Sequence, residues 1–441
     1  MTCDLGRVVV ASLLCLGAAH GTEQPSSRKT GSAIFYHVDG TGIAQWQMAR
    51  MLIAGPDGEI NWDKLPHVAV YRGHAEDTVT PSSNAGATMH AYGVKVPYEG
   101  YGTDKEGKRP LSAAGRRKSI MEEAKERGIA VGVINTGGAA EPGTACFLTS
   151  VADRESGDEI VAQLVESGAD LILLGGEEFF LPEEVKGHFG PGKRKDDRNL
   201  IEEAKTAGYR VIYTREELAA LNESAGKVLG IFAGDDTFND ETEEELAAAN
   251  LPNYKAEAPT IAEMTAAALR IFGKRQFLLV AEEEGTDNFG NANNAEGVLE
   301  ALRRADEGLG VILDYIDEHP DTLVLTCADS EAGGSDAFGL RGAKYEKASI
   351  ETGHDKNGAP VDGVERTIEG GVAKPFVSAP DKAGRRHEFV VVWGSAMDTS
   401  GGIVARAAGL NAEKVKGSFD NTAVYPLFYE TLFGEAPRTD D

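Results

Sequence analysis

The feature that most constrains this chain is a repeated alternation of short apolar, β-prone runs with amphipathic stretches of helical spacing. The expected strands are Ala33–Val38, Val131–Ile134, Leu171–Leu174, Arg210–Tyr213, Leu229–Phe232, Phe277–Ala281, Thr322–Thr326 and Phe389–Trp393. The expected helices are Ser119–Arg127, Ile160–Ser167, Ile201–Ala207, Ile261–Phe272, Ala295–Glu318 and Ala423–Leu432. This order is typical of α/β proteins, in which helices cover a mostly parallel sheet.

The length of the chain bounds its domain organisation, and its net charge excludes some classes of function. With 441 residues, 41% of them hydrophobic, the chain can bury a large core, as one α/β domain with insertions or as about three domains. Its formal net charge of −27 excludes a general nucleic-acid binder, which needs a basic surface, and disfavours docking on anionic lipid. Most of the acidic side chains are expected on solvated surfaces.

The N-terminus resembles an export signal. Arg7 precedes the apolar stretch Val8–Ala19, which is too short to span a bilayer, and polar residues follow. We therefore expect a cleaved secretory signal over residues 1–22 and a periplasmic or secreted protein. No other stretch approaches the length of a membrane span, so none is predicted.

The mature chain is expected to form one α/β domain over residues 30–436. Within it, residues 335–388 are rich in Gly, Lys, Asp and Pro and show little periodicity, which favours an insertion that acts as a lid or an interface. Only Cys146 and Cys327 remain after signal removal. They permit one disulfide, but no thiolate zinc site of recognisable spacing.

Carboxylates follow the expected strands, where functional groups of open α/β sheets gather. These acidic residues are Asp39, Glu141, Glu282, Glu283, Glu284, Asp287, Asp329 and Asp398. Each could be a cap or turn residue, but several converging on one sheet edge would repel one another unless cations lie among them. Oxygen ligands alone favour Mg²⁺, with Mn²⁺ or Ca²⁺ as alternatives, over Zn²⁺.

A nucleophile candidate lies in the segment 78–88. Ser82 and Ser83 precede a run of small residues that can open a helix, whose N-terminus would stabilise an anion. The alternative is that the serine only caps the helix.

Taken together, these residues resemble the alkaline phosphatase family. The motifs DGTG at Asp39–Gly42, SNAGAT at Ser83–Thr88 and YGVK at Tyr92–Lys95 occur in the family's order, followed by PTIAEMTAAALRIF, EEEGTD, DTLVLTCAD and YPLFYETLFG. The resemblance spans Ser32 to Gly434, interrupted by Ser335–His387. It implies a three-layer α/β sandwich with helices on both faces, hydrolysis of small phosphate monoesters through a phosphoserine, and a homodimer.

The resemblance also implies roles for single residues. Ser83 would be the nucleophile and Arg154 the clamp of the substrate phosphate. The carboxylate ligands of two or three divalent cations would be Asp39, Glu141, Glu282, Asp287 and Asp329.

The departures from the family are systematic. Asn291, Ser330 and Asp398 stand where the family carries the histidines of its zinc sites, and Gly143 stands where a hydroxyl is usual, so that Thr144 would have to substitute. Replacement of all three histidines by oxygen-bearing residues favours harder cations, with Asn291 and Asp398 as further ligands. His37 shares a strand face with Asp39 and could approach the site, but a histidine satisfied in the core is the expected role.

Two other functions stay open at this stage. A related ester hydrolase would act on phosphate diesters or sulfate esters, and a non-catalytic relative would only bind phosphate or metal. Loss of the family histidines motivates the second alternative.

Overall fold

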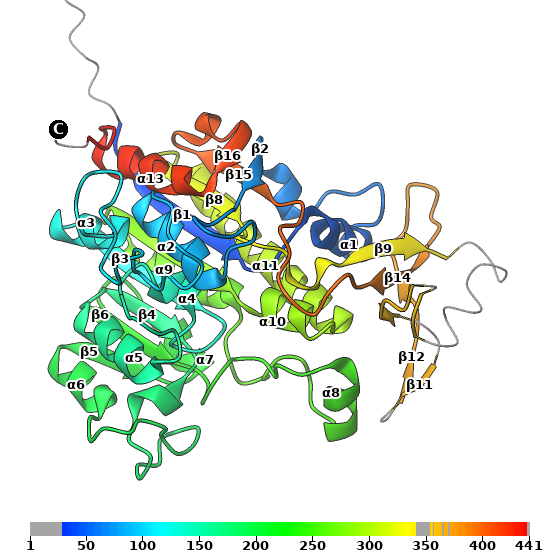
Figure 1. The fold of residues 1–441 in the computed structure, drawn as a ribbon, viewed down its shortest axis with the longest axis horizontal. Helices are drawn as coiled ribbons and strands as arrows, with labels where there is room; N and C mark the ends of the chain where they lie inside the picture. The colour runs from blue at the N-terminus through cyan, green and yellow to red at the C-terminus, as the bar shows by residue number, and fades with distance from the viewer. Residues whose placement is uncertain (1–28, 341–352, 356, 364–365, 369–370, 439–441) are drawn as a thin grey trace, which may run out of the picture.

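The computed structural model describes residues 29–340, 353–355, 357–363, 366–368 and 371–438. The predicted signal, residues 1–22, lies outside the described residues. At the centre is a sheet of ten strands in the order β16-β2-β15-β8-β1-β7-β3-β4-β6-β5 (Figure 1).

The strands of this sheet have the following bounds, given in sheet order: β16 Gly417–Asp420, β2 His67–Arg72, β15 Val404–Gly409, β8 Thr322–Cys327, β1 Ser32–Val38, β7 Phe277–Glu283, β3 Ala130–Asn135, β4 Leu171–Leu174, β6 Lys227–Ile231 and β5 Tyr209–Ile212. Only β15 runs antiparallel to its two neighbours, β8 and β2. The prediction of a mostly parallel sheet is confirmed.

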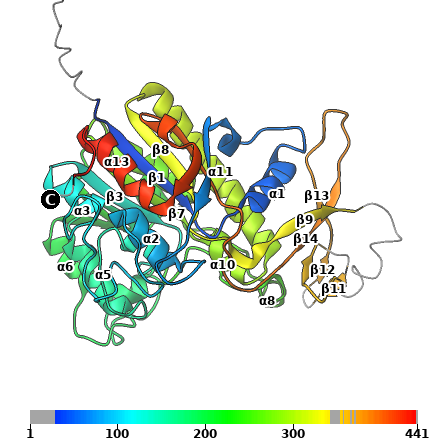
Figure 2. The ribbon, with the colours of Figure 1, turned by 45° about the horizontal axis from the view of Figure 1, so that its top comes forward.

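Both faces of the central strands are buried: side chains alternate between the two faces, and every residue of β1, β7, β3 and β8 is buried. In β1, Phe35 packs into one hydrophobic core, whereas Ile34 and Tyr36 pack into the other. The first core is covered by α2 (Ser83–Tyr92), α3 (Ile120–Glu126), α5 (Gly157–Glu166), α6 (Leu200–Thr206) and α13 (Val424–Phe433). The second is covered by α1 (Ile43–Ile53), α7 (Arg215–Ala219), α9 (Ile261–Phe272) and α11 (Ala295–Glu318). The three-layer sandwich is therefore confirmed (Figure 2).

Local sequence explains where the longest helices begin. The Asn294 side chain caps α11 by accepting from the backbone N–H of Gly297, and Thr260 forms a capping box with Glu263 at the start of α9. In α11, Leu302, Leu309 and other apolar residues at helical spacing are fully buried. Both helices have the bounds that the sequence predicts.

The expected strand Phe389–Trp393 exists, but outside the central sheet. As β14 (Glu388–Val392), it pairs antiparallel with β9 (Asp336–Gly339), β10 (Val361–Asp362) and β13 (Phe376–Val377). The apolar run predicts a strand correctly, but Val390 is buried by packing against Val361 rather than beside β8. We call β9, β10, β13 and β14 the peripheral sheet; it lies at one end of the molecule in both views, near the hairpin β11 (Arg366–Ile368) and β12 (Gly371–Ala373) (Figures 1 and 2).

Two further sequence expectations are answered by the described residues. Cys146 and Cys327 are both buried and free, so the disulfide that they permit is not formed. Among the described residues, none of the helices combines the length and the apolar character that a bilayer crossing requires.

Candidate metal and phosphate site

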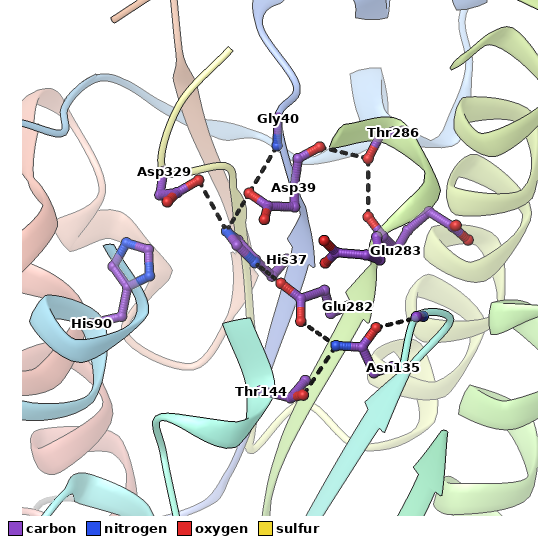
Figure 3. Close-up of polar contacts among 12 residues, drawn as sticks. His37, Asp39, Gly40, His90, Asn135, Thr144, Glu282, Glu283, Thr286 and Asp329 are labelled. Carbon is purple, nitrogen blue, oxygen red and sulfur yellow. Dashed lines mark hydrogen bonds and ion pairs between the residues drawn. The ribbon is translucent and has the colours of Figure 1, made fainter. Parts of the chain in front are cut away.

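The ends of four neighbouring strands bring polar side chains into one row. In the register of the sheet, Cys327 of β8 lies beside His37 of β1, His37 lies beside Glu282 of β7, and Glu282 lies beside Asn135 of β3. His37 and Glu282 follow Phe35 and Val280 by two residues and so face the core side that carries α2. Parallel pairing thus places the predicted carboxylates within reach of one another (Figure 3).

Asp39, Glu282, Glu284 and Asp329 form the centre of the site. Their exposed fractions are 0%, 0%, 3% and 1%. Asp39, Glu282 and Glu284 each offer an oxygen atom within 4.8 Å of the others, and His37, Asp39 and Asp329 form a second such group. One carboxylate oxygen each of Asp39, Glu284 and Asp329 has no hydrogen-bond partner within the described chain.

The electrostatics of this cluster are unfavourable for the protein alone. Burial, followed by repulsion from Asp287, raises the pKa of Asp39 well above its usual range. Burial and the Asp39 charge do the same to the pKa of Asp329. Since buried carboxylates ionise readily only beside cations, these unsatisfied oxygens fit divalent metal ions.

A second carboxylate pair adjoins this centre. In α10 (Gly285–Asn291), the Asn291 amide donates to Asp287 at 3.1 Å and to Asp398 at 3.0 Å. A Cβ atom on Gly40 would lie 2.6 Å from the Asp287 carboxylate, so the pair packs against the turn after Asp39. Asp398 reaches this position from the loop after β14 and not from a central strand end.

Gly143 is required by close packing. A Cβ atom there would lie 1.5 Å from the Glu282 carboxylate, so any side chain would force this carboxylate out of its position beside His37 and Asn135. The Thr144 hydroxyl lies nearby: its Oγ1 accepts from the Asn135 amide at 3.1 Å, and that amide also donates to Glu282. Nearby, Glu141 precedes α4 (Pro142–Ala145), and burial together with the Glu282 charge raises the pKa of Glu141 to about 7.

The two serines of the sequence motif have different roles in α2. Ser82 is the N-cap, since its hydroxyl accepts from the backbone N–H of Ala85 at 3.3 Å. Ser83 is the first helical residue, 8% exposed, at the positive end of the helix. A Cβ atom on Gly86 would lie 2.3 Å from Asp329, which shows that the first turn of α2 rests on this carboxylate.

Arg154 is the basic residue next to this turn. Its guanidinium, 44% exposed, donates to the Asn84 side chain at 3.3 Å. The Arg154 charge also opposes the upward shift in the pKa of Glu141. The guanidinium therefore lies between the start of α2 and the carboxylates, open to solvent.

His37 lies closer to the carboxylates than the sequence suggests. Its Nδ1 is 2.8 Å from Glu282, and its Nε2 is 3.6 Å from Asp39 (Figure 3). The sequence predicts a core role for His37; it places Glu284 among the strand-end carboxylates but not among the metal ligands, and it does not single out Asn135. The signal available for His37 was its place two residues before Asp39 on the same strand face.

The three-layer fold and the acidic site beneath the start of α2 define a class of α/β hydrolytic enzyme with its site at the strand ends. The family profile of the alkaline phosphatases matches residues 32–431. The chain therefore belongs to the alkaline phosphatase family, whose members act on phosphate esters.

Individual relatives agree with this placement. The streptomycin-6-phosphate phosphatase of Streptomyces griseus is 25% identical, over 96% of this chain and 94% of that protein. Alkaline phosphatase 4 of Bacillus subtilis is 24% identical, over 76% of this chain and 70% of that protein. Among solved structures, the Thermus thermophilus alkaline phosphatase has a TM-score of 0.70 at 23% identity, over 96% of each chain. The enzyme of the Antarctic bacterium TAB5 has a TM-score of 0.68 at 18% identity, over 92% of this chain and 98% of that one.

Proposed function

We propose that this protein is a metal-dependent phosphate monoesterase that works through a phosphoserine on Ser83. The observation that carries the proposal is the placement of the α2 N-terminus directly on Asp329, beside buried carboxylates that have oxygens without partners. In this arrangement an anionic substrate can lie between the helix end and bound cations.

Divalent ions would be held by Asp39, Glu282 and Asp329, with Asp287, Asn291 and Asp398 around a further position and Glu141 at the edge. Bound ions supply charge neutralisation and lower the pKa of nearby hydroxyl groups. Mg²⁺, Mn²⁺ and Ca²⁺ fit a donor set dominated by oxygen. A substituted form of the TAB5 enzyme has been solved with Mg bound, which is consistent with this choice.

The chain's own groups perform the substitution at phosphorus. Ser83 Oγ forms a bond to phosphorus while the bond to the ester oxygen breaks, and the alcohol leaves with a proton. Water then attacks phosphorus, releases inorganic phosphate and restores the Ser83 hydroxyl. Arg154 donates to the non-bridging oxygens, where a planar guanidinium offers paired N–H groups, and holds the phosphate in line with Ser83.

A substrate panel with added metals tests this function. Protein freed of metal by EDTA is assayed with Mg²⁺, Mn²⁺, Ca²⁺ or Zn²⁺ on a phosphate monoester, a phosphate diester and a sulfate ester. Monoester turnover that returns with a hard cation supports the proposal. Faster turnover of the diester or sulfate ester would assign the chain to one of those activities, and inactivity with every metal would favour a binding protein.

The cellular setting belongs to the same proposal. We propose that residues 1–22 are removed on export, that residues 30–436 act as one domain, and that residues 335–388 are an insertion in it. Membership of the alkaline phosphatase family also favours the proposal that this protein is a homodimer. Mass spectrometry of the exported protein and its molar mass in solution test these points.

A further inference from the structure

We propose that His37 is a metal ligand: its Nε2 binds a divalent cation together with Asp39 and Asp329, and Glu282 holds the ring in place through Nδ1. The inference rests on the proposed function, since it adds a ligand to the same ions. Neither the sequence motifs of the family nor the expected oxygen ligands include this residue.

The position of His37 is the first argument. The ring is fully buried on β1, and Nε2 has no hydrogen-bond partner within the described chain. Nε2 lies 3.6 Å from Asp39 Oδ1 and 4.0 Å from Asp329 Oδ1. Both distances exceed those of a hydrogen bond. An ion that is about 2.1 Å from each ligand atom holds neighbouring ligands roughly 3–3.5 Å apart, so these spacings suit a shared ion after a shift of a few tenths of an ångström.

The second argument is the contact on the other side of the ring. Nδ1 lies 2.8 Å from Glu282 Oε1, and Glu282 is itself held by the Asn135 amide. A carboxylate that accepts from Nδ1–H leaves the lone pair on Nε2, which faces the other carboxylates. Metal-binding histidines commonly have this kind of carboxylate partner, because it fixes both the tautomer and the orientation of the ring.

Sheet register explains why this arrangement is built in. His37 and Glu282 are directly opposite each other in the parallel pair β1 and β7, and both lie on the α2 side of the sheet. Phe35 stacks on the His37 ring with centroids 5.3 Å apart, which limits rotation. The backbone and the packing therefore set the direction of Nε2 before any ion arrives.

A nitrogen ligand from His37 changes which divalent ion the site is expected to bind. Asn291, Ser330 and Asp398 can offer only oxygen atoms as metal ligands. His37 adds one imidazole nitrogen at the position between Asp39 and Asp329. Imidazole ligands favour Zn²⁺ and other transition-metal ions over Mg²⁺ and Ca²⁺, and Mn²⁺, which binds oxygen ligands well, also accepts an imidazole nitrogen. We therefore expect the His37 position to take a transition-metal ion even where the neighbouring positions take Mg²⁺.

The competing role is a protonated His37 that takes the place of a cation. The titratable groups that face the ring are Asp39, Glu282, Asp329 and His90, whose ring lies 5.7 Å away, centroid to centroid, and whose pKa is lowered by burial. In that role Nε2–H would point at oxygen atoms beyond hydrogen-bond distance. Removal of the imidazole would then open room for an additional ion.

Pulsed EPR of the Mn²⁺-loaded protein tests the proposal. Full-length protein treated with EDTA and reloaded with Mn²⁺ is compared with protein grown on nitrogen-15 histidine. We expect a coupling between the Mn²⁺ spin and a directly bound nitrogen, with a frequency that changes with the label. His37→Gln should abolish the coupling and lower the bound Mn²⁺ by about one ion per chain. The matched control His90→Gln, a second fully buried histidine, should retain both.

Each outcome separates this proposal from the proposed function. A labelled wild-type protein without histidine coupling overturns it, even if neither variant folds. Coupling that persists in His37→Gln, or an additional ion bound by that variant, also overturns it. If the protein hydrolyses the monoester but shows no histidine coupling, the proposed function stands and His37 is not a ligand. If histidine coupling is seen but no ester is hydrolysed, His37 is a ligand and the proposed function is wrong.

Discussion

Two carboxylate–histidine pairs in this chain differ in how many hydrogen-bond donors surround their carboxylates. Next to the peripheral sheet, Asp381 lies 3.0 Å from His387 and accepts from Arg385 Nε at 2.9 Å and from the backbone N–H groups of Ala383 and Arg385. In the central site, Glu282 holds His37 at 2.8 Å, but the neighbouring carboxylates have oxygens without any donor.

Because of this difference in donors, the pKa values of the carboxyl groups in the two regions shift in opposite directions. Backbone and side-chain donors lower the pKa of Asp381, whereas burial and like charges raise the pKa of Asp39 and Asp329. The protein itself thus supplies the positive charge around Asp381. In the central site we propose that bound cations supply the missing charge, so the two regions should respond differently to metals, pH and substitution.

The largest expected effect is on turnover, from Ser83→Ala. Without the nucleophilic oxygen we expect kcat for a phosphate monoester to fall by at least about 10³-fold. The content of bound metal should stay near that of the wild type, because the orphaned carboxylates hold the ions. Initial rates and elemental analysis measure the two quantities.

Ser82→Ala is the matched control for this prediction. Loss of the N-cap should lower stability by about 1 kcal/mol, while turnover falls by less than about tenfold. If Ser83→Ala retains turnover within about tenfold of the wild type, the phosphoserine mechanism is wrong.

A second prediction concerns the sign of a stability change at Asp329. In metal-free protein, Asp329→Asn should raise the free energy of unfolding by about 1–2 kcal/mol, because a buried amide is neutral at every pH, whereas burial and the Asp39 charge make it costly to ionise Asp329. With saturating Mn²⁺ or Mg²⁺ the same substitution should lower it by a similar amount, since a ligand is lost. Urea unfolding with and without EDTA measures both. The same sign under both conditions would contradict a cation-dependent site.

The pH dependence should also reverse with metal. In metal-free protein, the pKa of Glu141 is about 7 in the folded state, above its unfolded value. The stabilising contribution of this protonated carboxyl is therefore complete below about pH 4.5 and is lost as the pH rises through about 7, a change of roughly 1–3 kcal/mol.

With metal bound, stability should instead rise over the same pH range, because protons compete with the ions for carboxylate oxygens. Thermal unfolding between pH 5 and 8 with EDTA or with Mg²⁺ measures the two slopes. Glu141→Gln should make the metal-free slope shallower, and the raised pKa values of Asp39 and Asp329 account for the slope that remains. A metal-free slope that is already flat in the wild type would show that Glu141 is ionised without cations.

The sequence predicts the buried part of the fold well. β1, β7, β3 and β8 are apolar on both faces, so they appear as uninterrupted apolar runs. The sequence does not predict the strands β2, β15 and β16, because their side chains are partly exposed or small and the short-range pattern does not distinguish them from loops. For β14 the short-range pattern predicts the strand but not the sheet to which it belongs.

The site shows a similar division. Asp39 comes directly after β1 and Asp329 lies two residues after β8, so their convergence can be expected from sequence. His37 could not be assigned, because a histidine inside an apolar strand is ambiguous until the register places it beside Glu282. Asp398 was expected from the strand 389–393, yet it reaches Asn291 from a loop that only the folded chain defines.

The smallest expected effect comes from Asp381→Asn, which tests the other half of the comparison. His387 is 49% exposed, and the donors around Asp381 belong to one short turn, so solvent replaces much of what is lost. We expect Tm to fall by less than about 3 °C, equally with EDTA and with Mg²⁺. Turnover should stay within about twofold of the wild type, because the hydrogen bonds of Asp381 run to Ala383, Arg385 and His387 of its own turn and not to the carboxylates of the central site. Calorimetry and initial rates measure these changes. A metal-dependent Tm shift or a loss of turnover of about tenfold would show that the segment 335–388 is coupled to the site and is more than a structural insertion.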